Sequence, residues 1–166
     1  MDVDRHPQRR PHRPADATPA RRGPVVVPIR SEADLVLVLA GGAEAERRGT
    51  ALELVHAVRP AWSPVITGRA GPPPARGPRG HDDEIAALRA RALTLARLSA
   101  VTVTWTTALG RADDVLERIC RDRSATLLVV GADRKQLTTR RLRSTLAGAR
   151  RLARRAATPV HLICRG

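Results

Sequence analysis

The stretch Thr126-Leu127-Leu128-Val129-Val130-Gly131 decides the fold of this chain. Four apolar residues in succession indicate a strand that is buried on both faces, because a strand with one face in water would alternate apolar and polar residues. Strands of this kind belong to parallel sheets that carry helices on both faces. The stretch therefore predicts an α/β protein.

Segments elsewhere in the chain repeat this pattern. Further apolar or β-branched strands are predicted at residues 25–29, 51–57, 101–107 and 160–164. Segments with helical spacing of apolar residues separate them, at about residues 31–48, 82–95, 112–121 and 142–156. This alternation predicts right-handed crossovers and a Rossmann-like, five-stranded parallel sheet with helices on both faces.

A sheet of this kind binds ligands beyond the carboxyl ends of its strands, at the point where the strand order reverses. For the order 3-2-1-4-5, that point lies between the ends of the first and fourth strands. The residues that follow those strands are Arg30-Ser31 and the turn predicted to start at Gly131. We therefore expect the ligand site there.

The chain divides into an arm and one domain. Residues 1–24 hold six arginines and five prolines without apolar periodicity, which predicts a disordered basic arm. Residues 25–166 are predicted to form the α/β domain. Within it, residues 59–81 carry six prolines and four glycines, which predicts a mobile loop that ends where Asp82 and Asp83 cap the next helix.

The charge and composition restrict the classes of partner. The formal net charge of +14 points to nucleic acid or another anionic surface. Lys135 is the only lysine, however, and an excess of arginine in a chain rich in Arg, Ala and Pro is also typical of GC-rich coding sequence. Phe and Tyr are absent and the only tryptophans are Trp62 and Trp105, which effectively excludes stacking platforms for single-stranded nucleic acid.

The compartment follows from what the sequence lacks. No apolar run approaches the roughly 20 residues that cross a bilayer, and no signal sequence is recognisable at the start. We therefore expect a cytoplasmic protein without membrane contact. Cys120 and Cys164 lack metal-ligand spacing and are predicted to be small buried hydrophobic residues rather than a disulfide.

Several local matches make the chain resemble the universal stress protein family. Residues 52–57 read like the second strand of that family, including the histidine at His56. Residues 110–116, Gly-Arg-Ala-Asp-Asp-Val-Leu, resemble the start of its third helix without the usual proline. Residues 127–131 match the strand that opens its nucleotide loop, and residues 158–160, Thr-Pro-Val, match the start of its last strand.

The resemblance implies a nucleotide site with several residues replaced. ATP-binding members have a loop of Gly, two residues, Gly, nine residues, Gly and then Ser or Thr, whose backbone N–H groups bind phosphate. At that spacing this chain has, in order, Gly131, Arg134, Ser144 and Thr145. It also has Arg30 in place of the aspartate that contacts the ribose or base, and Ala57 in place of the valine that contacts adenine.

Two functions remain open for this crevice. The first is a binding or regulatory module with a degraded ATP crevice and no metal, which forms a homodimer through its fifth strand as the resembling family does. In the second, Arg30 and Arg134 convert the crevice to a site for a more anionic ligand, because guanidinium groups replace the glycine N–H donors on phosphate.

A cationic helix face gives a competing class of function. Residues 134–155 contain nine basic residues and no acid. At about 100° per residue, five arginines fall opposite the apolar stripe of the last helix. They are Arg143, Arg150, Arg151, Arg154 and Arg155. This face is either an ordinary solvated surface or a weak, sequence-independent contact for nucleic acid or an acidic protein.

No residue pattern indicates an enzyme. The chain has no Gly-x-Ser-x-Gly elbow, Walker loop or zinc spacing. His81-Asp82-Asp83-Glu84 is interpreted as the start of a helix rather than as a metal cluster. His56 and His161 lie in apolar strands and are predicted to be hydrogen-bonded structural residues.

Overall fold

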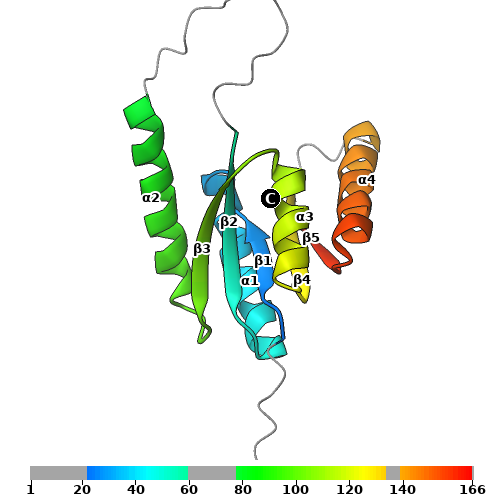
Figure 1. Cartoon of the computed structure of the whole chain (residues 1–166), viewed down its shortest axis with the longest axis horizontal. Coiled ribbons are helices and arrows are strands. Elements are labelled where there is room, and N and C mark those ends of the chain that lie inside the picture. Colours follow the sequence, from blue (N-terminus) through cyan, green and yellow to red (C-terminus); the bar gives the residue numbers. More distant parts are fainter. Residues whose placement is uncertain (1–21, 60–77, 134–138, 166) are drawn as a thin grey trace, which may run out of the picture.

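The computed structural model describes residues 22–59, 78–133 and 139–165, and these form a five-stranded parallel sheet with the order β3-β2-β1-β4-β5 (Figure 1). The strands are β1 (Val25–Pro28), β2 (Leu52–Val58), β3 (Val103–Leu109), β4 (Leu127–Asp133) and β5 (Val160–Arg165). The helices are α1 (Val36–Arg48), α2 (Pro78–Ala96), α3 (Ala112–Asp122) and α4 (Thr139–Ala156), with the short 3-10 helix η1 (Glu32–Asp34) before α1. The predicted fold and strand order are confirmed.

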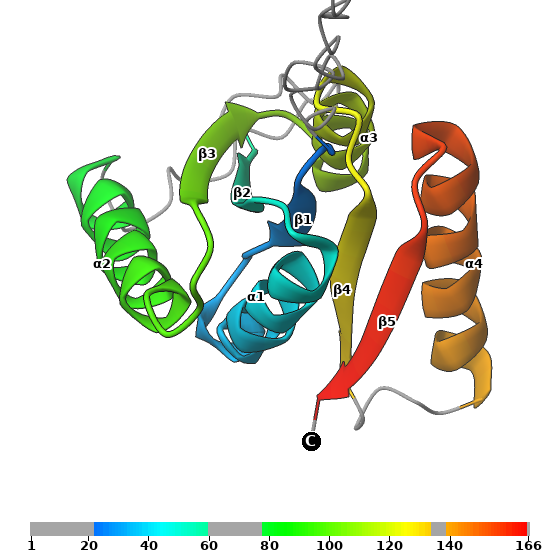
Figure 2. The same cartoon turned by 90° about the horizontal axis from the view of Figure 1, so that it is seen from below.

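Two helices cover each face of the sheet (Figure 2). Alternate residues of β1 explain this arrangement, because Val25 and Val27 pack into the core beside α1 and α2, whereas Val26 packs into the core beside α3 and α4. In β4, Val129 packs into the core beside α1 and α2, and Leu128 packs into the core beside α3 and α4. All five side chains are fully buried, which is why these strands are apolar throughout rather than alternating.

Helix α1 lies unusually close to the sheet. A Cβ atom placed on Gly41 would come within 2.4 Å of Val27 Cγ2 and 3.1 Å of Leu52 Cδ1. Real Cβ atoms do not approach other carbon atoms so closely, so position 41 requires the absence of a side chain. The end of the helix follows the usual rule, because Gly49 adopts a left-handed φ of 61° immediately after Arg48.

Some predicted boundaries were wrong. Gly131 does not open a turn but lies inside β4, where it pairs with Ile163, because β5 extends the ladder as far as Asp133. Helix α2 begins at Pro78 rather than at Asp82, since the fixed φ of proline suits the first turn of a helix. Ser31 makes no side-chain capping bond to the helix that follows.

The described chain begins with an anchored segment. Thr50 donates its hydroxyl to the carbonyls of Arg22 and Gly23, and Thr126 donates to the carbonyl of Gly23. Arg22 to Pro24 therefore belong to the folded domain, although the sequence placed them in the arm. The remainder of the predicted arm, and residues 60–77 of the predicted loop, lie outside the described residues.

Candidate functional site

The carboxyl ends of β1, β2 and β4 meet at one edge of the sheet, where the sequence predicts the ligand site. Ile29, the residue after β1, donates its N–H to the carbonyl of Val55 over 2.8 Å and extends the ladder by one residue. The register pairs Pro28 with Val55, so Arg30 and Ala57 lie at similar heights. Gly131 lies in β4 on the other side of β1.

Arg30 is paired with a buried carboxylate. Its backbone N–H donates to Asp34 Oδ2 over 2.9 Å, its Nε donates to the same atom over 3.3 Å, and its Nη2 donates to Asp34 Oδ1 over 3.3 Å. Asp34 is only 1% exposed, whereas the side chain of Arg30 is 57% exposed. Asp34 therefore compensates the charge of Arg30, and the guanidinium is not an unpaired cation at the crevice.

Sequence reasoning missed the role of Asp34. No motif singled out Asp34, whereas its carboxylate accepts from the backbone N–H and the guanidinium of Arg30. The sequence feature that could have indicated this pair is the negative charge of Asp34, four residues after Arg30. In a helix such spacing brings two side chains together, and here η1 provides a similar turn.

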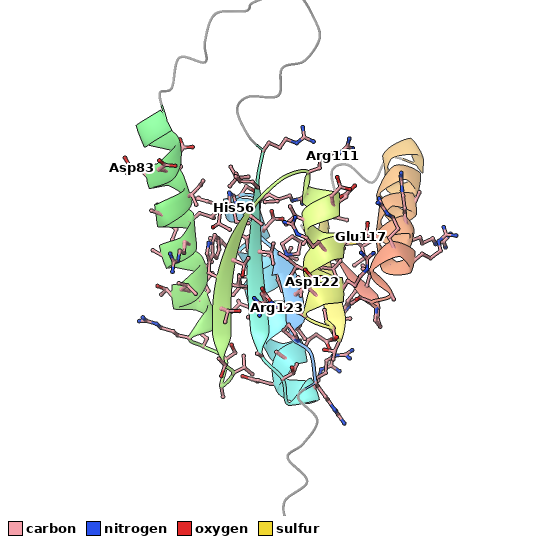
Figure 3. The ribbon with its side chains drawn as sticks, in the orientation of Figure 1. His56, Asp83, Arg111, Glu117, Asp122 and Arg123 are labelled. Atoms are coloured by element: carbon pink, nitrogen blue, oxygen red, sulfur yellow. The ribbon has the colours of Figure 1, made fainter. Side chains whose placement is uncertain are left out.

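His56 connects the end of β1 to the outer strand β3. Its Nδ1 lies 2.6 Å from the carbonyl oxygen of Ile29, and its ring stacks on that of Trp105 with centroids 5.9 Å apart and planes at 16°. The residue is buried at 7% exposure and labelled in Figure 3. The predicted hydrogen-bonded histidine is confirmed at this position.

The remaining nucleotide-site residues are only partly brought together. Ala57 is half-buried on the face that α3 covers, and Arg134 lies outside the described residues. Ser144 and Thr145 lie within α4, beyond its first turn, because the helix begins at Thr139. Their place as the closing residues of the nucleotide loop stays a prediction, because their side chains lie outside the described set.

The predicted arginine face is divided between two environments. Arg155 Nε lies 2.7 Å from Glu117 Oε2 on α3, and Arg121 Nη2 lies 2.6 Å from Glu117 Oε1 and 3.1 Å from the carbonyl oxygen of Arg155. Arg155 thus fastens α4 to α3 instead of facing solvent freely. Its side chain is still 51% exposed, so its part in a cationic face stays a prediction, with Glu117 offsetting its charge.

The other predicted arginines of that face differ from Arg155. Arg150, Arg151 and Arg154 are exposed, and none forms an ion pair with another residue that the structure describes. Arg154 Nε donates to the carbonyl of Arg150 over 3.4 Å, as a side chain lying along its own helix does. Arg143 lies within α4, and its side chain is outside the described set.

Glu44 forms an ionic cluster beside the edge strand β5. Burial alone would raise its pKa, but the hydrogen bond from Arg48 and the charge of Arg47 outweigh burial and lower the pKa. His161 Nδ1 lies 3.4 Å from Glu44 Oε1. The side chain of His161 is 51% exposed, so the prediction of an interior histidine is wrong there, because β5 is the last strand of the sheet.

The two cysteines occupy different environments. Both thiols are free, with Cys120 buried on α3 and Cys164 exposed on β5. The pKa of the Cys120 thiol is raised to about 11, because burial, with a smaller contribution from the charge of Glu53, outweighs a hydrogen bond with Thr158 that lowers it. The prediction of a buried cysteine holds for Cys120 and is wrong for Cys164, which lies on an edge strand.

The described ranges hold neither a metal-binding group nor a membrane-spanning helix. No three His, Cys, Asp or Glu side chains there lie close enough together to hold a metal ion. None of the described helices combines the length and the apolar character needed to cross a bilayer.

An open parallel α/β sheet with its crevice at the reversal of strand order defines a class of ligand-binding domains. The sequence model of the universal stress protein family matches residues 22–163, and the chain belongs to that family. No curated protein matches the sequence.

Solved structures share the fold at low sequence identity. A universal stress protein in complex with cAMP has 22% identity and a TM-score of 0.62, over 87% of this chain and 99% of that one. The universal stress protein from Archaeoglobus fulgidus in complex with dAMP has 17% identity and a TM-score of 0.59, over 88% and 99%. UspA from Lactobacillus plantarum has 20% identity and a TM-score of 0.59, over 87% and 99%.

Proposed function

We propose that this universal stress protein is a cytoplasmic binding and regulatory module, not an enzyme, and that its crevice binds ATP weakly or not at all. The observation that supports this proposal is the pair between Arg30 and Asp34. ATP-binding members of the family have an aspartate at the position of Arg30. Here the nearby carboxylate is buried and already accepts from three donors of Arg30, so it has little capacity left for a ribose or an adenine.

The crevice is also a poor site for a more anionic ligand through Arg30. A phosphate that approached the guanidinium would have to compete with Asp34, whose carboxylate stands within 3.3 Å of two guanidinium nitrogens. Withdrawing Arg30 would remove a counter-charge from the buried Asp34, which is costly. We therefore favour a crevice that binds ATP weakly or not at all over a crevice that binds a more anionic ligand.

Calorimetric titration of the full chain with ATP tests the proposal. We expect no saturable heat up to about 1 mM ATP, which corresponds to a binding free energy no stronger than about −4 kcal/mol. Binding of one ATP per chain with micromolar affinity would overturn the proposal.

A designed double variant identifies the cause of weak binding. Arg30→Asp alone would place two carboxylates together, so we combine it with Asp34→Asn, whose amide oxygen still accepts from the backbone N–H of residue 30. Asp34→Asn alone is the control. We expect the double variant to bind ATP at least about tenfold more tightly than the control. Equal affinities would show that Arg30 is not the obstacle.

The exposed arginines of α4 support a second candidate function. We propose that Arg150, Arg151 and Arg154 give weak, sequence-independent contact with nucleic acid or an acidic protein, because no described acid neutralises them. Gel shifts of a duplex DNA over a salt series should weaken steeply with salt. The triple change to glutamine should remove the shift, whereas Arg118→Gln on the exposed surface of α3 should leave it nearly unchanged. No shift at low salt would eliminate this candidate.

We also propose a homodimer that forms through β5. This strand is one edge of the described sheet, and Leu162 and Ile163 on it are only half-buried in the single chain. Apolar edge strands need covering. Sedimentation of the full chain would distinguish a dimer from a monomer.

A further inference from the structure

We propose that the groove between α2 and β3 is a docking site for an extended peptide of a partner protein, which adds to the sheet as a strand beside β3. The peptide would carry apolar side chains at alternate positions and an acidic side chain that meets Arg89. This site lies at the opposite edge of the sheet from β5. It does not use the crevice, so it goes beyond the proposed function and does not depend on it.

The first observation is that no described strand covers the outer edge of β3. Within the described parts of the chain, β3 pairs only with β2. Its seven residues, Val-Thr-Trp-Thr-Thr-Ala-Leu, include no charge and no proline. Natural edge strands are usually blunted by charges, prolines, bulges or a covering element, because an open strand is a template for another strand. The other edge, β5, carries His161 and Arg165.

On its outer side, β3 has backbone N–H and C=O groups that no described strand pairs with. Leu52 N–H donates to the carbonyl of Thr102 over 2.9 Å, and Gly110 N–H donates to the carbonyl of Val58 over 3.0 Å. Even-numbered residues of β3 therefore direct their backbone groups toward β2. The alternation of a parallel ladder leaves the N–H and C=O groups of Val103, Trp105 and Thr107 directed outward.

The second observation is a groove beside these outward groups. Figures 1 and 2 show α2 beside β3, and a cavity of about 530 Å³ lies between them. Its apolar lining includes Ile85, Ala86 and Leu93 of α2 and Trp105 of β3. This volume is within the range of ligand-binding clefts, roughly 300–1,000 Å³. A helix that runs beside an exposed edge strand is a recurring arrangement for peptide recognition by strand addition.

The groove lies on the outer side of α2. Arg91 forms an ion pair with Glu32, which lies just before α1. The side of α2 that carries Arg91 therefore faces α1. Leu88 and Ala92 face the sheet and are buried in the core. The groove residues occupy the remaining side, beyond the edge of β3, where an added strand would place every second side chain.

Trp105 is held in position for such a contact. Its ring stacks on His56, and its Nε1 donates to Thr107 Oγ1 over 2.9 Å. Because His56 is itself bonded to the carbonyl of Ile29, the indole has little freedom to lose on binding. An ordered aromatic side chain in a groove is a common anchor of interfaces.

The groove carries one charge of each sign, and the net charge of +14 on the whole chain favours its cation as the group that selects the peptide. Arg89 and Asp82 line the groove, and neither forms an ion pair with another described residue. A guanidinium prefers a carboxylate, which it binds in a forked geometry. The net charge of +14 also favours acidic partners in solution. A second copy of this chain is a poorer occupant, because it would bring its own α2 to the same side of the joined sheet.

The test uses displayed nonapeptides with every position randomised, selected on the full chain. We expect enrichment of sequences with an apolar residue and an acidic residue two positions apart. The affinity of a fluorescein-labelled synthetic copy of the selected peptide is then measured by anisotropy, with and without ATP. No enrichment over an unrelated basic protein would overturn the proposal.

Two matched pairs of variants locate the peptide. Ala86→Leu fills the groove and should weaken binding at least about tenfold, whereas Ala87→Leu, exposed on the next residue outside the groove lining, should change it less than about threefold. Thr107→Pro removes an outward N–H and should also weaken binding at least about tenfold, whereas Thr107→Ser retains both the N–H and the hydroxyl to which Trp105 donates and should stay within about threefold.

Each outcome is decisive. A peptide affinity that neither Ala86→Leu nor Thr107→Pro changes would overturn the proposed site. A dimer in sedimentation that Thr107→Pro dissociates would show that a second copy occupies β3 and would overturn the peptide assignment. Tight ATP binding would overturn the proposed function of the crevice but leave the peptide affinities of these four variants unchanged.

Discussion

The variant Gly41→Val is expected to lose about 3 kcal/mol of unfolding free energy, the largest loss that we expect from a single substitution here. Its Cβ would come within 2.4 Å of Val27 Cγ2, and the two further methyl groups have no free space between α1 and β1. Val27 is fully buried and stiff at χ1, so it cannot move aside. Urea unfolding measures the loss of unfolding free energy. Thermal unfolding should show a fall in Tm of about 10 °C.

Two controls separate this contact from a general effect of replacing glycine. Gly148 lies in α4 with nothing within 4 Å of the position of a Cβ, so Gly148→Ala should be neutral or stabilise by up to about 1 kcal/mol. The combination of Gly41→Val with Val27→Ala should be less destabilising than the sum of the two single changes, because Val27→Ala removes the clashing atom. A stable Gly41→Val variant would show that α1 does not lie so near to β1.

The two thiols are expected to differ by at least about 1,000-fold in their rate of reaction with a disulfide reagent at pH 8. Cys120 is 1% exposed, and its pKa of about 11 leaves only about one thiolate in 1,000 at that pH. Cys164 is exposed, so its reaction with the reagent should form a fast first phase. Absorbance should therefore show one thiol in the native protein and a second only after unfolding.

The variants assign the two phases and add a pH dependence. Cys164→Ser should remove the fast phase, and Cys120→Ala should leave it intact. Because folding raises the pKa of Cys120 from about 9 to about 11, its stabilising effect is complete below pH 9 and is lost as the pH rises toward 11. Two thiols that react at similar rates in the native protein would contradict the burial of Cys120.

The strand pattern made most of the fold predictable. Buried parallel strands are apolar on both faces, and this property identified β1 and β4 from their β-branched runs. The ends of the elements were less predictable. Gly131 was interpreted as a turn because glycine usually interrupts a strand, but the ladder with Ile163 continues through it.

The candidate site was predictable in place but less so in chemistry. Strand order fixed the crevice at the ends of β1 and β4. The partners of the charged residues were not visible in the pattern, since Asp34 neutralises Arg30 and Glu117 neutralises Arg155 only after the chain has folded. The groove beside β3 had no motif at all, because it depends on the position of one helix beside an edge strand.

The anchoring of Gly23 determines how the molecule is oriented when it is tethered. Thr50 and Thr126 hold this residue at the amino ends of the strands, and a Cβ on Gly23 would lie 1.8 Å from the carbonyl oxygen of Ser124. A surface or fusion partner joined directly to Arg22, in a variant without residues 1–21, therefore meets the domain at the end remote from the crevice. Immobilisation at that point leaves the carboxyl edge of the sheet directed away from the support, which suits it to surface-based binding measurements.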